Sequence, residues 1–375
     1  MRTAALFLVS VLSILPGLPG LPGPLLPDAS AEAPKPSIRL GGIFSLSGFG
    51  AHGGLGELRA AQLAVQEINA AGGIDGHKVE LLVEDNQSDL KATAAAFKKL
   101  VNLNDIDALI GPNWSEFSEV AAPLAERAKV PMITPSGVIT SNADRKYVFT
   151  LMQPPIETNR ALAEALLSTA GVTEVVGLVQ NNLYLENAWN ASKQVFGDRV
   201  KVTEVRLTVG QPTDYRSILV RTAKRPGVAI YASLLPGEYA PLLNARRQLE
   251  IAAPVFAVDI LYDKGKPTDA ATNAGVVGTD FIVLGSENFH SAFKKRFGEK
   301  PLNYGAKAYD AARLLAESYV ECGRRNVDCL RTVDKRGESG HLKFDENQVV
   351  VSDEAVAETY VFKNGDWLRD VKKAQ

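Results

Sequence analysis

The sequence has few cysteines, almost no excess charge and no long apolar run beyond its first residues. Only two of its 375 residues are cysteine, too few for a disulfide scaffold or a four-thiolate zinc site. The 41 Lys and Arg residues nearly balance the 43 Asp and Glu residues, for a formal net charge of -2. A nucleic-acid-binding protein is usually strongly basic. We therefore expect no nucleic-acid partner, and the length predicts two domains rather than one small motif.

Catalytic and cofactor motifs are also missing. The sequence has no G-x-S-x-G elbow, H-E-x-x-H motif, P-loop or calcium loop. The segment Gly48-Phe49-Gly50-Ala51-His52-Gly53 fits the G-x-G-x-x-G pattern of dinucleotide-binding loops. However, the next acids at a strand end, Glu84 and Asp85, follow Gly53 by at least 31 residues, whereas the cofactor needs one after about 20. We expect no enzyme activity, no cofactor and no metal, and assign the glycines to a turn or to a small anionic ligand at a helix start.

The N-terminal segment differs from the rest of the chain in its proline content, because seven of the twenty prolines precede residue 37. It begins with Met1-Arg2, a short positive start, continues with an apolar run over residues 4–15 and then reaches Ala29-Ser30-Ala31. This is the order of regions in a cleaved signal peptide. The apolar run is too short to span a bilayer, which needs about 20 residues. We predict that residues 1–31 are a signal peptide and that the protein is exported.

From residue 38 onward, short apolar runs alternate with segments of helical period. Two series follow each other, divided by Gln153-Pro154-Pro155. The first series predicts strands at 38–44, 79–83, 107–110 and 130–134 and helices at 58–68, 89–103 and 115–128. The second predicts strands at 175–179, 200–207, 228–232 and 254–258 and helices at 157–170, 185–196, 214–225 and 239–249, with a late helix at 306–322. Such alternation predicts parallel sheets covered on both faces, in two similar lobes.

The two cysteines lie close together, with six residues between Cys322 and Cys329, just beyond the late helix. In the oxidising compartment that export implies, this spacing predicts a local disulfide that closes a turn.

Candidate ligand groups lie on the loops after the strands, because open α/β sheets bind ligands at the carboxyl ends of their strands. Here these loops are 45–54, 111–116, 135–140, 181–185, 233–238 and 259–262. Their polar side chains include Ser47, Ser115, Ser136 and Asp259, and their flat apolar ones are Trp114, Tyr184 and Tyr262. This mixture favours a small molecule with one polar end.

Several segments together resemble a known family. Residues 38–85 contain a strand, the turn Ser45-Leu46-Ser47-Gly48, an Ala-rich helix that ends in Glu67-Ile68-Asn69-Ala70-Ala71-Gly72-Gly73-Ile74-Asp75-Gly76, and a second strand. This order resembles the start of the branched-chain amino-acid-binding (leucine-binding) proteins, the type I periplasmic solute receptors of ABC transporters. Ile110-Gly111 with Ser115, Val130-Pro131-Met132-Ile133-Thr134-Pro135-Ser136 and Ala308-Tyr309-Asp310-Ala311-Ala312 resemble later segments of the same family.

The resemblance implies an α/β fold with two Rossmann-like lobes of parallel sheet, joined by a three-segment hinge that closes on ligand. We expect the N-terminal lobe to comprise residues 37–154 plus 283–341, and the C-terminal lobe residues 155–282 plus 342–375. The resemblance also implies a periplasmic, monomeric receptor that delivers a small-molecule ligand to an ABC permease in the inner membrane. A secreted hydrolase and a receptor that signals to a sensor partner remain the alternatives.

The resemblance also assigns roles to individual residues. In family members that bind amino acids, a Ser and a Thr hydroxyl with backbone N–H groups hold the α-carboxylate. Ser115 matches the Ser position and Gly137 the backbone contact, while Val138 replaces the Thr.

On the second lobe, an acid and a Tyr of these family members hold the ammonium group. Tyr184 matches another family tyrosine, the ammonium-binding Tyr falls at Leu234 or Leu235, and the acid at Asp259. Two polar contacts of the family are therefore missing. The complete set of predicted ligand-binding residues is Ser115, Ser136, Gly137, Val138, Tyr184, Leu234, Leu235, Asp259, Trp114 and Gly53.

Two ligand classes follow. A hydrophobic or branched-chain amino acid is the first, and an aliphatic or aromatic carboxylate is the alternative. Ser115 would hold the carboxylate in both, so the classes differ in whether Asp259 faces a cation.

Overall fold

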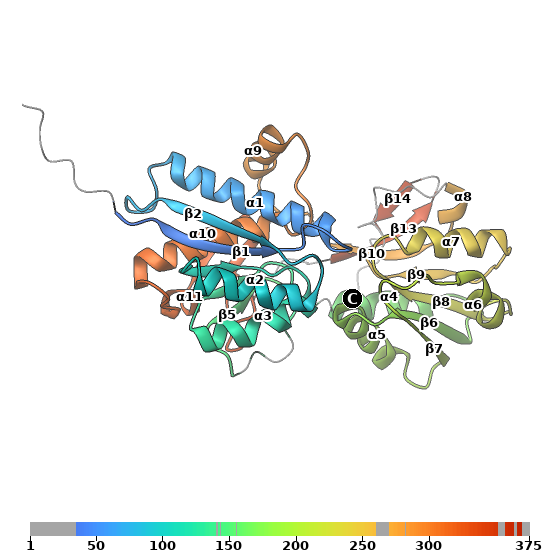
Figure 1. Cartoon of the computed structure of the whole chain (residues 1–375). Coiled ribbons are helices and arrows are strands. Elements are labelled where there is room, and N and C mark those ends of the chain that lie inside the picture. The colour runs from blue at the N-terminus through green and yellow to red at the C-terminus, as the bar shows by residue number, and fades with distance from the viewer. Residues whose placement is uncertain are drawn as a thin grey trace, which may run out of the picture. The chain divides into compact units, whose positions relative to one another are not determined.

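The structure, a computed structural model, describes residues 35–139, 142, 144–154, 156–259, 270–281, 283–351, 357–363 and 366–369. The predicted signal peptide lies outside these residues, as does Tyr262. From Lys35 onward the chain forms one compact unit, which contains two main β-sheets (Figure 1). We call each sheet with the helices that cover it a lobe, the first and the second in chain order.

The first lobe is built on five parallel strands in the order β2-β1-β3-β4-β5. These are β1 (Ile38–Phe44), β2 (Val79–Asp85), β3 (Ala108–Ile110), β4 (Met132–Thr134) and β5 (Val148–Thr150). Strands β1, β3 and β4 are almost continuously apolar and buried, as expected of parallel strands covered on both faces. The four strands predicted in this region are confirmed. The three residues of β5 are too few to show a period, and this strand was not predicted.

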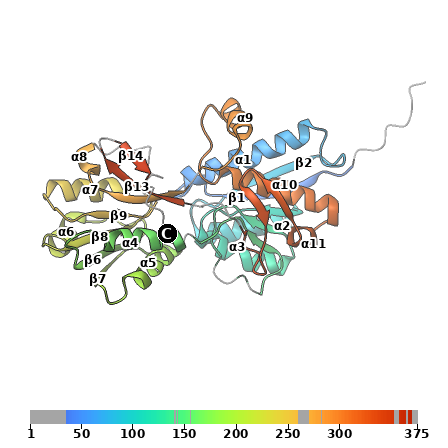
Figure 2. The same ribbon diagram turned by 180° about the vertical axis from the view of Figure 1, so that it is seen from behind.

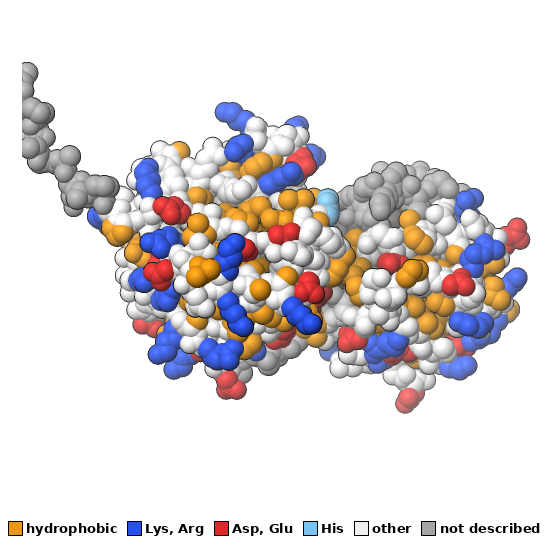
Figure 3. All heavy atoms as spheres, viewed as in Figure 1, with side chains coloured by type: hydrophobic (Ala, Val, Ile, Leu, Met, Phe, Trp, Pro, Cys, Tyr) orange, Lys and Arg blue, Asp and Glu red, His pale blue; other side chains and the backbone are white. Residues whose placement is uncertain are grey.

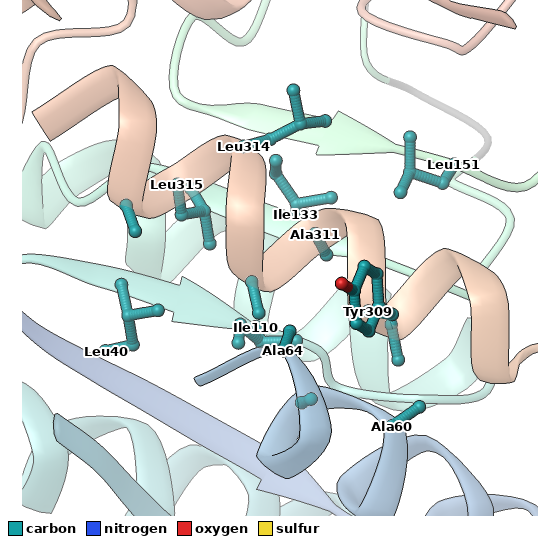
Figure 4. Packing of buried hydrophobic residues seen from close by; sticks show 14 of the residues in the cluster. Leu40, Ala60, Ala64, Ile110, Ile133, Leu151, Tyr309, Ala311, Leu314 and Leu315 are labelled. Atoms are coloured by element: carbon teal, nitrogen blue, oxygen red, sulfur yellow. The ribbon is translucent and has the colours of Figure 1, made fainter. Parts of the chain in front are cut away.

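Helices cover both faces of the first sheet. They are α1 (Ala51–Ala70), α2 (Leu90–Asn102), α3 (Ser115–Ala128), α9 (Glu287–Phe297), α10 (Gly305–Cys322) and the short α11 (Asp328–Arg331). Helices α1, α9 and α10 bury their apolar side chains on one face, and α2 and α3 on the other. Ala60 and Ala64 of α1 and Ala311 of α10 belong to the same buried cluster between the helices and the sheet (Figure 4). These small side chains let the two helices approach each other over the sheet.

The second lobe is built on seven strands in the order β14-β13-β10-β9-β8-β6-β7. They are β6 (Glu174–Gln180), β7 (Lys201–Leu207), β8 (Val228–Ser233), β9 (Val255–Ala257), β10 (Val277–Phe281), β13 (Ala357–Lys363) and β14 (Asp366–Arg369). Strands β6 to β10 are mutually parallel, whereas β13 pairs antiparallel with β10 and β14 antiparallel with β13. Its helices are α4 (Ile156–Leu167), α5 (Leu183–Phe196), α6 (Tyr215–Thr222), α7 (Tyr239–Gln248) and α8 (Ala270–Asn273). The C-terminal segment thus completes the second sheet as an antiparallel edge.

The boundary between the lobes near residue 342 differs from the prediction, which assigned residues 342–375 to the C-terminal lobe. A hairpin of β11 (Asp334–Gly337) and β12 (Gly340–Lys343) precedes this segment. Leu342, Phe344 and Val350 lie in the core of the first lobe, and Thr150 of β5 bridges to Val349. Residues up to Val350 therefore pack with the first lobe, because their alternating apolar side chains fill its core. The other predicted lobe boundaries stay predictions.

A disulfide joins Cys322, the last residue of α10, to Cys329 in α11. The loop that it closes (Figure 2) carries Arg324 and Arg325, whose guanidinium groups bond Asp105 at 2.6 and 3.2 Å. Arg324 also contacts Asp107, directly before β3. The disulfide loop therefore connects the end of α10 to the start of a central strand.

We expect Cys322→Ser combined with Cys329→Ser to lower the free energy of unfolding by about 2 kcal/mol, because a short loop is no longer closed in the unfolded chain. Urea unfolding with and without a thiol reductant measures this. The double variant should not respond to the reductant, whereas the wild-type protein should lose the same amount. Equal stability of the oxidised and reduced wild-type protein would contradict the expectation.

The described residues include no helix that is both long enough and apolar enough to cross a membrane. On the face shown in Figure 3, basic and acidic side chains are interspersed, in keeping with the balanced charge of the sequence.

Candidate functional site

A cleft with an empty volume of about 570 Å³, counting space open to solvent, lies among the loops that follow the strands. Of the ten residues predicted to bind ligand, eight line it, and Gly137 and Val138 do not. Four further residues that were not in the predicted set also line it. Among the residues that the structure describes, the lining consists of Gly53, Glu57, Trp114, Ser115, Ser136, Tyr184, Leu185, Leu234, Leu235, Pro236, Asp259 and Tyr304.

The two predicted residues outside the lining support Ser115 from behind. The N–H of Gly137 donates to Thr134 Oγ1 at 2.9 Å, and a Cβ on Gly137 would lie 2.0 Å from Ser118 Oγ. The N–H of Val138 donates to Ser115 Oγ at 3.0 Å. Both backbone donors are thus used within the first lobe, and the structure assigns Gly137 and Val138 to the support of the loop rather than to the wall of the cleft.

Ser115 is the first residue of α3 and is 1% exposed. The first N–H groups of a helix have no partner within it and favour an anion. The residue before it, Trp114, has φ 67° and ψ 141°, a backbone conformation that residues other than glycine rarely adopt. Its indole contacts Phe49 edge to face at 5.5 Å and packs against the core of the second lobe. This wall of the cleft combines a hydroxyl and a helix start with a flat apolar ring.

The glycine loop before α1 is held by side chains of the next strand end. The Asp85 carboxylate accepts from the Leu46 N–H at 2.9 Å and from the Ser47 hydroxyl at 2.7 Å. Although partial burial raises the pKa of Asp85, these bonds and that from the Gln87 N–H leave it below its ordinary value. Gly53 lies in the first turn of α1, where its backbone lines the cleft. Asp85 therefore has a structural role, and Ser47 serves the loop rather than the ligand.

The second lobe contributes a hydrogen-bonded acid and tyrosine. Tyr184, in the first turn of α5, donates its hydroxyl to Asp259 Oδ2 at 2.7 Å. Asp259 follows β9 with φ 52°, and its N–H donates to Thr279 Oγ1 at 2.9 Å. Burial and the neighbouring Asp259 charge raise the pKa of Tyr184 well above its ordinary value, so its hydroxyl stays protonated. The tyrosine beside the acid thus comes from α5, although the sequence placed the corresponding family position at Leu234 or Leu235.

Both leucines form apolar wall. Leu234 is 2% and Leu235 4% exposed. Their N–H groups are bonded behind the wall, that of Leu235 to Gln180 Oε1 at 2.6 Å and that of Leu234 to the Tyr239 hydroxyl at 3.3 Å. Leucine here leaves no unpaired backbone donor and presents only hydrocarbon to a ligand.

Glu57 is the most informative of the lining residues that sequence reasoning missed. It lies on α1 one turn before Ala61 and two turns before Ala64, on the face that α1 buries. Burial raises the pKa of Glu57 to about 8, against the lowering effects of the Ser136 hydrogen bond and the Lys307 charge. An acid that interrupts a small apolar helical face was the signal in the sequence. Leu185 and Pro236 lie on the candidate loops 181–185 and 233–238 but were not singled out, and Tyr304 carried no comparable signal.

A hydrogen bond also joins the two lobes beside the cleft. Asn182 caps α5 by accepting from the N–H groups of Tyr184 and Leu185, and its Nδ2 donates to Glu116 Oε1 of α3 at 2.7 Å. Burial raises the pKa of Glu116 to about 7. Helices α3 and α5, whose first turns both line the cleft, are therefore connected directly.

The ionisable side chains of Asp, Glu, Lys, Arg and His type in the described lining are two acids, Glu57 and Asp259. Among the described residues, no group of three His, Cys, Asp or Glu side chains is arranged to hold a metal ion. The site can therefore offer a ligand hydroxyl groups and a helix start on one side, a carboxylate with a tyrosine hydroxyl on the other, and apolar rings and leucines between them.

Comparison with known proteins gives consistent results. An amino acid binding protein of Pseudomonas aeruginosa is 24% identical over 234 residues, which cover 60% of this chain and 61% of that protein. The structure of the branched-chain amino acid transporter substrate-binding protein LivJ from Streptococcus pneumoniae, in complex with isoleucine, superimposes with a TM-score of 0.75 at 25% identity, covering 89% of this chain and 100% of the other.

A solute-binding protein of an ABC transporter from Rhodopseudomonas palustris BisB5, in complex with 3,4-dihydroxybenzoic acid, has a TM-score of 0.72 at 18% identity, covering 88% of this chain and 95% of the other. This second likeness shows the fold. The matched segments span 30 to 61% of the length of the curated relatives that the chain matches.

The family described as periplasmic binding protein matches residues 37–333, which is most of the chain. The two lobes of largely parallel sheet, with the cleft among their strand-end loops, agree with this match. The chain therefore belongs to the periplasmic binding protein family and has its type I fold.

Proposed function

We propose that the protein is a solute-binding receptor of an ABC uptake transporter and that it closes on a small hydrophobic or branched-chain amino acid. The observation that carries this proposal is the hydrogen-bonded pair of Asp259 and Tyr184 in the wall of the cleft. A buried ammonium group needs an anion, and Asp259 supplies one. The described lining includes no lysine or arginine, so the negative charge of Asp259 favours a ligand that carries a positive group.

In the proposed complex each end of the amino acid meets a different lobe. The α-carboxylate binds at Ser115 and the start of α3, and the ammonium group binds at Asp259. The hydrocarbon side chain packs against Trp114, Leu234 and Leu235. Because the ligand contacts both lobes only when they are closed on it, binding favours the closed state.

No chemical step is part of this function. The ABC permease in the inner membrane would recognise the closed form and take the ligand from it. Export through a signal peptide at residues 1–31, location in the periplasm and a monomeric state belong to the same proposal.

Calorimetry of the purified protein against leucine, isoleucine and phenylalanine, with benzoate and hydroxycinnamate alongside, tests the ligand class. We expect micromolar binding of at least one amino acid, equivalent to about -8 kcal/mol. Heat from the carboxylates alone would contradict the amino-acid assignment.

An aromatic carboxylate is the second candidate, favoured by the flat side chains of Trp114, Tyr184 and Tyr304 in the lining. The Rhodopseudomonas palustris structure shows that this fold can hold such a ligand in another protein. Here the ring would lie among these side chains, and Asp259 would stay bonded to Tyr184 without meeting a cation.

Ser115→Ala should weaken both ligand classes by about ten- to a hundredfold, because a hydrogen bond to a charged group contributes about 1.5–3 kcal/mol. Calorimetry at pH 7 with leucine and with benzoate measures the change in Kd. Ser118→Ala is the matched control, since Ser118 is buried behind the loop and donates to the Pro112 carbonyl at 2.8 Å. Unchanged affinity in the Ser115 variant would remove this residue from the site.

A further inference from the structure

Glu57 combines three properties that the proposed binding mode does not use. It lines the cleft although the whole residue is 1% exposed. Its Oε1 accepts from the Ser136 hydroxyl at 2.5 Å. Its Oε2 is buried and has no hydrogen-bond partner among the described residues. A buried polar oxygen without a partner is costly and calls for an explanation.

The hydrogen bond of Ser136 bears on the role of Glu57. The sequence assigned this serine to the ligand, but its proton points to Glu57. Ser136 therefore has no donor left for an anionic ligand, whereas Glu57 Oε2 has no hydrogen-bond partner among the described residues. A carboxylic acid in its neutral form has one O–H donor, whereas an ionised carboxylate only accepts.

We propose that Glu57 is a further ligand-contacting residue, whose neutral carboxylic acid donates a hydrogen bond from Oε2 to the carboxylate of the bound ligand. This inference rests on the proposed function, because it uses the same cleft and a ligand that carries a carboxylate. The contact would add to that of Ser115 and lie on the same lobe.

The surroundings of Glu57 keep it neutral at pH 7. Burial raises its pKa to about 8, and the charge that acts against this rise is Lys307 of α10. Burial in turn lowers the pKa of Lys307 to about 8, and its ammonium group lies 3.8 Å from Met152 Sδ. The other carboxylic acid in the described lining of the cleft is Asp259, which belongs to the second lobe.

Several charged side chains on the other elements around α1 are bonded to groups other than Glu57. These pairs are Arg296 of α9 with Gln66, Glu84 and Asp85 of β2 with Lys99 and Ser47, and Arg39 of β1 with the Asn104 carbonyl. Lys307 is therefore the main charge that the pH dependence must take into account.

The sign of the pH dependence follows from the donor role. Glu57 is protonated below its pKa and binds the ligand carboxylate; above it, the ionised form loses its donor and repels that carboxylate. Affinity should therefore fall as pH rises through about 8. If Glu57 instead held the ligand ammonium as an anion, its ionisation would strengthen binding.

The test compares wild type with Glu57→Gln by calorimetry from pH 6.5 to 9, with L-leucine and with benzoate as probes. Glutamine keeps an N–H donor at this position and does not titrate. The ratio of the wild-type Kd to the variant Kd should rise about tenfold between pH 7 and pH 9. The ligand ammonium titrates in both experiments and cancels in this ratio, which therefore reports Glu57 together with its effect on Lys307.

Glu57→Met removes the donor without leaving a charge and should raise Kd at pH 7 by at least tenfold, while Glu57→Gln stays within about threefold of wild type. A ratio that is flat or falls with pH would overturn the donor role, as would wild-type affinity in the methionine variant. If wild type binds neither probe, the proposed function fails with the inference. If wild type binds and only the ratio is flat, the inference alone fails.

Discussion

Asp259→Asn should weaken the binding of leucine or isoleucine at pH 7 by about a hundredfold or more. Asparagine nearly preserves the shape of the side chain and can still accept from the Tyr184 hydroxyl, now 2.7 Å from Asp259 Oδ2. It removes the negative charge, so the ligand ammonium is left buried without an anion. Loss of one partner of a buried pair costs about 3–5 kcal/mol, which corresponds to that factor in Kd.

The same variant separates the two ligand classes. A simple carboxylate has no ammonium group, so its affinity should stay within about threefold or rise slightly as repulsion from Asp259 is lost. Calorimetry with leucine and benzoate on one protein preparation gives both numbers. Asp198→Asn, an exposed acid of the second lobe, is the matched control and should change neither. Strong loss of benzoate binding together with unchanged leucine binding would reverse the proposed assignment.

Gly54→Ala should destabilise the protein by about 3 kcal/mol or more. In a helix, this substitution ordinarily stabilises by roughly 0.5–1 kcal/mol. Here a Cβ would lie 2.1 Å from the carbonyl oxygen of Ser45, a backbone atom that cannot rotate away. Either α1 or the loop after β1 must move, and both line or support the cleft.

Urea unfolding measures this loss, and calorimetry on the folded fraction should show weaker ligand binding as well. Gly305→Ala is the matched control because Gly305 is also in the first turn of a buried helix. The nearest atom to a Cβ at this position is Pro301 Cβ at 3.3 Å, so its effect should be small. An unchanged or raised stability of the Gly54 variant would show that α1 and the loop adjust freely.

The fold could be predicted from the sequence because its signals are local. Helix α3 has the predicted bounds, Ser115 to Ala128, and strand β1 likewise. Apolar period and the Gly and Pro residues between the runs are enough to define such elements. The antiparallel β13 and β14 were not predicted as strands, and Phe344 and Val350 were assigned to the wrong lobe. The lobe in which these residues pack depends on the space left in each hydrophobic core. A short segment of sequence does not encode that space.

The site could be predicted only in part, for a related reason. Strand-end loops indicated Ser115, Trp114 and Asp259, all of which line the cleft. The hydrogen bond between Tyr184 and Asp259 joins residues 75 positions apart, and no local pattern indicates it. Glu57 was overlooked because it lies within a helix rather than on a loop.

Two of the three tryptophans lie in very different surroundings, and this gives the protein a built-in optical reporter. The half-buried indole of Trp114 lines the cleft, so a ligand that displaces water from it should shift its fluorescence. The indole of Trp189 is fully buried in the second lobe and donates to Glu204 at 2.6 Å, so its emission should change only when that lobe unfolds. Tryptophan emission, followed once during a ligand titration and once during heating, therefore distinguishes occupancy of the cleft from loss of the fold.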